Sequence, residues 1–279
     1  FLPTFSLAMV VLLYAAAKCV YTHLNLLTFG SVPGESRRLG RGLLTSVLAL
    51  TVAGLLFTNH LETQARLSLE QDTLNQANVL TTIVNERLNE DKRIALIMSE
   101  HPAVISALSG GPVEACDKAV GISAGTIPGS ICYVADANGV CISSSNRATA
   151  ANLVGHSYAF RPYMKSSLAG EPGQYFALGV TSNERGHYSS HPVRDVATGR
   201  VIGVSVVKRS VASLLPLFYS CKYSFLLSPE GIVFLSSRPE CVLMPFSPLS
   251  AGQREHIAMT RQFGTIATTT IFPDTPPIP

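Results

Sequence analysis

Two uncharged apolar runs stand near the start of the chain, at residues 7–17 (LAMVVLLYAAA) and 43–57 (LLTSVLALTVAGLLF). Each is shorter than the ~20 residues that span a bilayer as a helix, but flanking residues can extend both. The pattern predicts a transmembrane helix over residues 43–58. For residues 1–29 two interpretations stay open, a further membrane helix or an artefact of upstream translation, since the chain begins at Phe1 and not at a methionine.

Basic residues lie between the two runs. Arg37, Arg38 and Arg41 form the densest positive cluster near either run, and such clusters tend to remain on the cytoplasmic side of a membrane. We therefore expect a basic cytoplasmic loop over residues 30–42, with the chain from about residue 59 onward outside. A cleaved signal peptide shows the same order of basic, apolar and polar residues, but no small-x-small cleavage site directly follows Phe57.

The chain from His60 to Glu100 contains no Gly or Pro. Within it, apolar or small residues recur every seven positions, at Leu67, Leu74, Thr81, Leu88 and Ala95. This spacing predicts one long helix over residues 59–102 that ends near Pro102 and that can pack on a domain and pair with a second copy of the chain. A short helix, AVISALSG, is expected to follow it.

The remaining pattern alternates strands with short helices. SICYVADANGVCISSS has two β-rich runs around Asn-Gly, which predicts a hairpin. FRPYMKSSLAG predicts a short helix, because Pro162 is tolerated in a first turn, and QYFALG, HYSSHPV and RVIGVSVVK predict three further strands. An α+β fold with an antiparallel sheet follows from this order. YSFLLSPEGIVFLSS repeats the hairpin pattern and indicates a second, incomplete sheet module.

The charge, the cysteines and the histidines of the chain bear on three kinds of site: a nucleic-acid-binding surface, a disulfide and a metal site. A net charge of +3, dispersed along the chain, does not suggest a nucleic-acid-binding surface. Cys132 and Cys141 flank the hairpin turn, where either a strained disulfide or two buried thiols would fit. His187 and His191 are four residues apart, but in a strand that spacing separates them by about 13 Å, which argues against a metal site.

Most of the common catalytic motifs are missing from the sequence. It contains no Walker, Rossmann or HExxH pattern. The serines of CISSSNR have no base placed near them by sequence, so a periplasmic hydrolase has little support. We therefore expect no catalysis by this chain, no cofactor and no metal.

The stretch from Ile131 to Lys208 carries FRPY, ALGVTS, RG and VVK in that order. It resembles the membrane-distal half of the double-Cache (PAS-like) sensor domains of four-carbon-dicarboxylate sensor histidine kinases. FLSSRPE and PLSAGQREHIAMTRQFG resemble the membrane-proximal half of the same receptors. With the long helix, the resemblance covers about residues 43–263. It implies a distal Cache module at residues 103–210 and an incomplete proximal module at residues 211–279, truncated before the kinase region.

The resemblance also implies a ligand and the residues that hold it. Relatives bind succinate, fumarate or malate, and Arg161 of FRPY matches their carboxylate-binding arginine. Lys208 of VVK matches the basic residue at the end of the last distal strand. Tyr158 and Ser182 match hydrogen-bonding positions of the pocket, and Thr181 and Ser190 complete the candidate set. The side-chain chemistry of Arg161 and Lys208 fits a dicarboxylate. A guanidinium can bind one carboxylate bidentately, while an ammonium neutralises the other.

The implied protein is a homodimeric receptor in the bacterial inner membrane whose sensor region faces the periplasm. The output domain stays open between a histidine kinase, a diguanylate cyclase and a chemoreceptor, and a binding module without a signalling role is a further alternative. Two departures from the family put the ligand's identity in question. Ser189 and His191 stand where relatives carry an aromatic residue, and Cys241 stands in place of a tryptophan. These departures and the missing end of the proximal module are expected of a fragment or a decayed gene.

Overall fold

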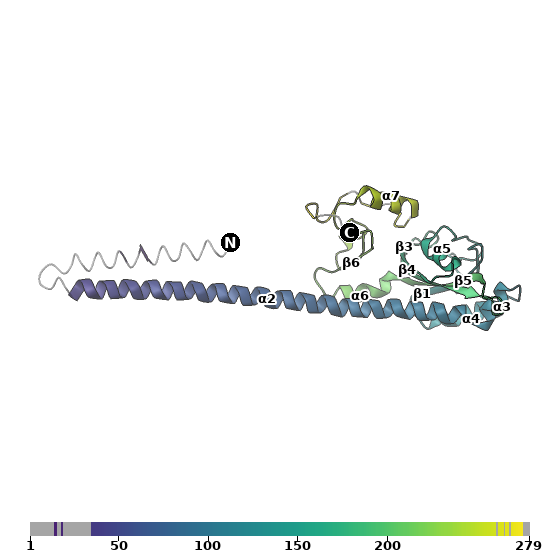
Figure 1. Ribbon diagram of the computed structural model, residues 1–279, viewed down its shortest axis with the longest axis horizontal. Coiled ribbons are helices and arrows are strands. Elements are labelled where there is room, and N and C mark those ends of the chain that lie inside the picture. The colour runs from purple at the N-terminus through teal and green to yellow at the C-terminus, as the bar shows by residue number, and fades with distance from the viewer. Residues whose placement is uncertain are drawn as a thin grey trace. The chain divides into compact units, whose positions relative to one another are not determined.

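The computed structural model describes residues 14, 15, 18, 35–260, 262–264, 266, 267 and 269–275 (Figure 1). The chain divides into two compact units, residues 1–76 and residues 77–279. Helix α2 (Glu35–Ser99) begins in the first unit and ends in the second. The prediction for residues 1–29 lies outside the described residues, apart from the three single positions.

Helix α2 is longer at its start than the sequence indicated. Residues 35–42, expected as part of a loop, are helical, because no proline interrupts the chain after Pro33 until Pro102. Among the described residues, none of the helices combines the length and the hydropathy needed to cross a membrane. The apolar run of residues 43–57 lies within α2 and passes directly into Thr58, Asn59 and His60. At its other end α2 stops at Ser99, close to the predicted position.

The second unit is built on a five-stranded sheet. Its strands are β1 (Ser130–Asp136), β2 (Cys141–Ser144), β3 (Gly173–Leu178), β4 (Arg185–Arg194) and β5 (Val201–Ser210). They lie in the order β2-β1-β5-β4-β3, and all neighbours are antiparallel. The predicted hairpin and the three further strands are thus confirmed. Asp136 shapes the hairpin turn by accepting from the amides of Asn138 and Val140, at 2.9 Å each.

Each face of this sheet has its own core. On one face lie α2, α3 (Pro102–Leu108) and α4 (Glu114–Gly125), and on the other lies α5 (Pro162–Leu168) (Figure 1). Helices α3 and α5 were predicted from the sequence, whereas α4 was not. Cys132 packs in the core beneath the three helices and Cys141 in the core beneath α5. The two thiols are unpaired, and because they face opposite sides of the sheet, no disulfide can join them.

The chain then forms a smaller second cluster. Its elements are η1 (Val211–Leu214), α6 (Leu215–Phe218), β6 (Phe225–Leu227), β7 (Val233–Ser236), η2 (Pro239–Cys241) and α7 (Ala251–Thr260). Strands β6 and β7 form the predicted second hairpin as a two-stranded sheet. This cluster meets the edge of β3, where the Leu178 amide donates to the Gln262 carbonyl at 2.7 Å. The two modules are therefore joined by backbone hydrogen bonding at the strand that leads to the candidate site.

Candidate ligand-binding site

A small cavity lies between the α5 face of the sheet and the loop that follows β3. Its lining comprises Tyr133, Leu153, Tyr158, Arg161, Tyr163, Gly179, Val180, Thr181, Ser182, Tyr188 and Lys208. Five of the six residues proposed from the sequence are therefore brought together: Arg161, Lys208, Tyr158, Thr181 and Ser182.

Arg161 is placed by the start of α5. It is the residue before Pro162 and has an extended backbone, φ −73° and ψ 136°, as expected ahead of a proline. Its side chain is 1% exposed, and Nη2 donates to the Leu178 carbonyl at 2.7 Å. The guanidinium carbon also lies 5.2 Å from the centre of the Phe160 ring. A buried guanidinium fixed on two sides in this way is a preorganised partner for an anion.

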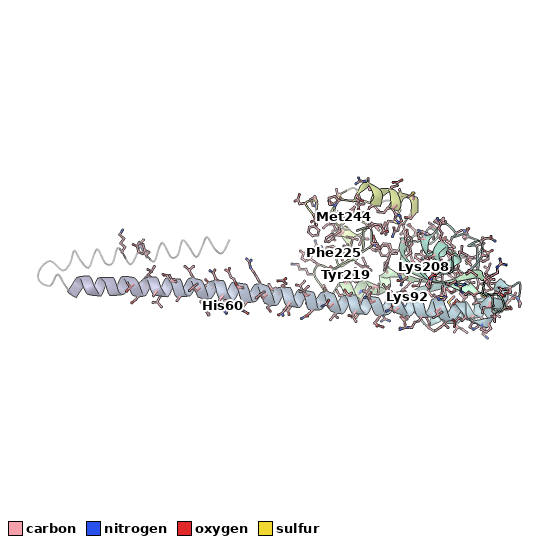
Figure 2. All side chains as sticks on the ribbon, viewed as in Figure 1. His60, Lys92, Lys208, Tyr219, Phe225 and Met244 are labelled. Carbon is pink, nitrogen blue, oxygen red and sulfur yellow. The ribbon has the colours of Figure 1, made fainter. Side chains whose placement is uncertain are left out.

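Lys208 reaches the same cavity from β5. Figure 2 marks its position among the side chains of the second unit. Its stem crosses Gly186, where a Cβ would come within 3.0 Å of the lysine Cε, so the glycine leaves room for the lysine. The ammonium donates to the Ser182 hydroxyl. Burial lowers the pKa of Lys208, and the nearby carboxylate of Glu184 opposes that shift. Among the described residues, no acid forms an ion pair with this ammonium.

Tyrosine hydroxyls supply the rest of the polar lining. Tyr158 Oη lies 3.0 Å from Thr181 Oγ1, and Tyr133 Oη lies 2.7 Å from Tyr163 Oη. Burial raises the pKa of Tyr158 and of Tyr163, so these phenols stay neutral and remain able to donate hydrogen bonds. The ring of Tyr188 stacks on that of Tyr163, with centroids 4.9 Å apart.

Ser190 differs from the other proposed site residues. It is not among the residues that line the cavity. Its hydroxyl lies 2.8 Å from that of Ser167 and donates to the Tyr163 carbonyl at 2.9 Å. These hydrogen bonds connect β4 to α5, and the hydroxyl does not line the cavity. Tyr133 and Tyr188 also line the cavity but were not predicted from the sequence. Strand alternation gives the signal for them, since Tyr188 pairs directly with Lys208 across the sheet.

The cavity is small. Its volume is about 20 Å³, roughly the space that one water molecule needs. The loop of residues 179–184 covers it through the contacts of Thr181 with Tyr158 and of Ser182 with Lys208. A ligand of several atoms must displace these contacts to enter.

A second hollow is larger but carries the wrong charges for a dianion. It has a volume of about 470 Å³ and is lined by Leu178, Asn183, Glu184, Arg185, Ser210, Val211, Ala212 and Leu243. Arg185 already donates to the Phe234 carbonyl, and Glu184 contributes a negative charge. The small cavity, with two buried cations, is therefore the better candidate for binding an anionic ligand.

Known proteins resemble this chain in sequence. No protein-family model matches it. The C4-dicarboxylate transport sensor protein DctB of Pseudomonas aeruginosa is 34% identical over 128 residues, which cover 46% of this chain and 21% of that protein. The protein of the same name from Rhizobium meliloti is 25% identical over 222 residues, 78% of this chain and 35% of that protein. The chain thus spans about a fifth and about a third of the length of these relatives.

A solved structure is similar to this chain both in sequence and in fold. The crystal structure of the V. cholerae histidine kinase DctB sensor domain superposes with a TM-score of 0.66 and 26% identity. The match covers 73% of this chain and 80% of that structure. The α+β fold, the antiparallel sheet and the long first helix are shared with that sensor domain.

Proposed function

We propose that this chain, whose folded part is a DctB-like Cache sensor domain, recognises a four-carbon dicarboxylate as the sensing region of a bacterial signal receptor. The ligand class is succinate, fumarate or malate. In this proposal a histidine kinase, as in the V. cholerae relative, converts recognition into a signal. The described residues take part in recognition only, and no catalytic step is assigned to them.

One observation carries the proposal. Two cations, Arg161 and Lys208, are 1% and 4% exposed and line one cavity from opposite elements. A dicarboxylate supplies two anions at once, one for each cation. The guanidinium suits a bidentate carboxylate contact and the ammonium a point-charge contact. Hydroxyls of Tyr158 and Thr181 are available for the remaining carboxylate oxygens.

Calorimetric titration of the whole chain with succinate tests this proposal. We expect saturable binding, and we expect monocarboxylates of the same length, such as butyrate, to bind far more weakly because one cation then stays without its anion. Equal affinity for succinate and butyrate would contradict the two-cation site.

Ligand affinity should fall on the alkaline side. Because burial lowers the pKa of Lys208, the free site loses its ammonium at a pH below the ordinary lysine value of 10.5. Above that lowered pKa, binding of a dianion must take up a proton, so affinity falls by up to about tenfold per pH unit. Calorimetric titrations with succinate between neutral pH and pH 10 measure how steeply the affinity falls with pH. Lys208→Arg is the control, since a guanidinium stays charged throughout; a slope that persists in this variant would exclude Lys208 as its cause.

We propose a homodimer formed through α2, on the ground of its exposed apolar side chains. Leu67 and Leu74 are 52% and 57% exposed, whereas Leu88 and Ala95 pack against the chain's own core. The seven-residue pattern therefore divides into an outer half for a partner and an inner half for the domain. Leu67→Lys with Leu74→Lys should lower the dimer fraction in sedimentation equilibrium. Val79→Lys, equally exposed but outside the seven-residue series, should not; equal effects of both changes would argue against this interface.

A location outside the cytoplasm, in a receptor of the bacterial inner membrane, is proposed from the same relatives. Gly110 lies in an exposed turn after α3, where an insertion disturbs little. Alkaline phosphatase fused after Gly110 should be active, because this enzyme requires export to fold. β-Galactosidase at the same site should be inactive, and the reverse pattern would place the domain in the cytoplasm.

A further inference from the structure

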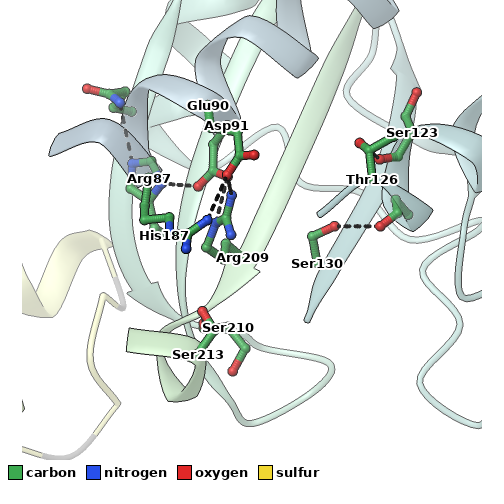
Figure 3. Close-up of polar contacts among 12 residues, drawn as sticks. Arg87, Glu90, Asp91, Ser123, Thr126, Ser130, His187, Arg209, Ser210 and Ser213 are labelled. Atoms are coloured by element: carbon green, nitrogen blue, oxygen red, sulfur yellow. Dashed lines mark hydrogen bonds and ion pairs between the residues drawn. The ribbon is translucent and has the colours of Figure 1, made fainter. Parts of the chain in front are cut away.

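A buried charged cluster joins the ligand-binding sheet to the long helix (Figure 3). Asp91 of α2 is fully buried. One of its carboxylate oxygens lies 3.0 Å from His187 Nδ1, and the other accepts from Arg209 Nε at 2.7 Å. Arg209 also donates to Glu90 through Nη2 at 2.7 Å. We call Asp91, His187 and Arg209 the helix clamp. It connects α2 to both β4 and β5.

The clamp and the ligand cavity share the same two strands. His187 pairs with Arg209 across β4 and β5, and the next pair along the strands is Tyr188 with Lys208. Successive side chains of a strand point to opposite faces. The pair Tyr188 and Lys208 therefore lines the cavity, while the adjoining pair contacts α2. A backbone displacement at Lys208 is passed on to Arg209 through a single peptide bond.

Stability alone does not account for such a cluster. Removing charged groups from water costs several kcal/mol per ion, and apolar side chains of similar volume would usually stabilise the fold as well or better. What buried polar groups contribute is a defined arrangement, because their hydrogen bonds tolerate little displacement. The clamp therefore fixes the position of α2 on the sheet more sharply than apolar packing would.

Other contacts between α2 and the sheet are also polar. Ser205 donates to the Ala95 carbonyl at 2.6 Å, and the Ser99 hydroxyl lies 3.0 Å from His191 Nδ1. Between His187 and His191, on the same face of β4, the Ser189 hydroxyl is buried and has no hydrogen-bond partner among the described residues. The sheet thus contacts the last turns of α2, over residues 91–99, through directional hydrogen bonds.

From this geometry we infer that Asp91 is a positioning residue that transmits occupancy of the cavity to α2. The inference rests on the proposed function. A ligand carboxylate that replaces Ser182 at the Lys208 ammonium must move Lys208, Tyr188 or the covering loop, because the cavity holds about one water. Movement of Lys208 or Tyr188 shifts the next pair on the strands, His187 and Arg209, and with it the bonds to Asp91. Among the residues that the structure describes, Asp91 contacts the sheet through this pair alone, so a shift of the pair acts on α2.

Hydrogen exchange of α2, measured by mass spectrometry on the whole chain with and without saturating succinate, tests the inference. In the wild-type protein succinate should change deuterium uptake over residues 84–99. Asp91→Asn should bind succinate with a Kd within about threefold of wild type but lose the succinate-dependent change in α2. A purely structural role would alter uptake equally with and without ligand. Ser189→Ala is the matched control, because it is buried on the same face of β4 and removes no bond; it should keep both properties.

If Asp91→Asn does not fold, His187→Asn tests in its place whether the helix clamp transmits occupancy of the cavity to α2. It removes one bond of the clamp and leaves the pair of Asp91 with Arg209 intact, so that no buried charge loses its partner. The inference is overturned if a folded clamp variant retains the full succinate-dependent change, or if wild type binds succinate without any change in α2. Absence of succinate binding by wild type in the calorimeter would instead refute the proposed function, and the inference with it.

Discussion

Replacing Lys208 by aspartate is expected to abolish measurable succinate binding and to favour a ligand that carries an amine at that end. Lys208 is 4% exposed, so its charge acts on a ligand with little screening by solvent. Aspartate at this position turns an attraction into a repulsion, which we expect to cost about 4 kcal/mol or more, roughly a thousandfold in Kd. Calorimetric titration with succinate, malate and an amino acid of similar length measures both the loss and the gain.

Lys208→Met separates charge from shape in the same experiment. It keeps an unbranched stem beside Gly186, where the space is limited, and removes only the ammonium. Its succinate affinity should lie between those of wild type and Lys208→Asp. Unchanged dicarboxylate affinity in Lys208→Asp would show that this lysine does not contact the ligand.

Removal of the Arg161 guanidinium should have the second largest effect. Arg161→Met leaves one ligand carboxylate in a buried site without its charge-assisted partner, a loss of about 2–5 kcal/mol and thus well over tenfold in Kd. Arg161→Lys should recover only part of this loss, since an ammonium cannot make the bidentate contact. The measurement is again calorimetric, with succinate as the ligand.

Thermal unfolding has to accompany these titrations, because Arg161 also donates to the Leu178 carbonyl and its loss can weaken the fold. Arg147→Ala is the matched control. It removes a half-exposed arginine that pairs with Asp117 at 3.3 Å and that does not line the cavity. Wild-type affinity in a folded Arg161→Met protein would exclude this arginine from the site.

Local patterns predicted most elements of the sheet. Asn138 and Gly139 mark a turn by their own backbone preferences, and strand alternation around them needs no distant contact. Alternation also explains why Lys208 faces the cavity while Arg209 faces the helix. The two cations of the candidate site were proposed through a family resemblance, since nothing in the local sequence pairs Arg161 with Lys208. Their convergence depends on the order of the strands, which single-strand patterns do not specify.

Local sequence patterns could not predict the helix clamp, because Asp91 and Arg209 lie 118 residues apart in the chain. One signal was nevertheless present. Val84, Leu88, Asp91, Ala95 and Met98 follow the spacing of a buried helical stripe, and an acid within such a stripe requires a partner.

The covered cavity also sets the concentration at which such a receptor would respond. If the loop of residues 179–184 must open before ligand enters, the dissociation constant observed equals the intrinsic one divided by the fraction of open molecules. Asn183 holds a left-handed backbone with φ 50° and is not part of the cavity lining. A change there alters that fraction without touching the ligand. Receptors with identical pocket chemistry could in this way be tuned to scarce or abundant dicarboxylate by the loop alone.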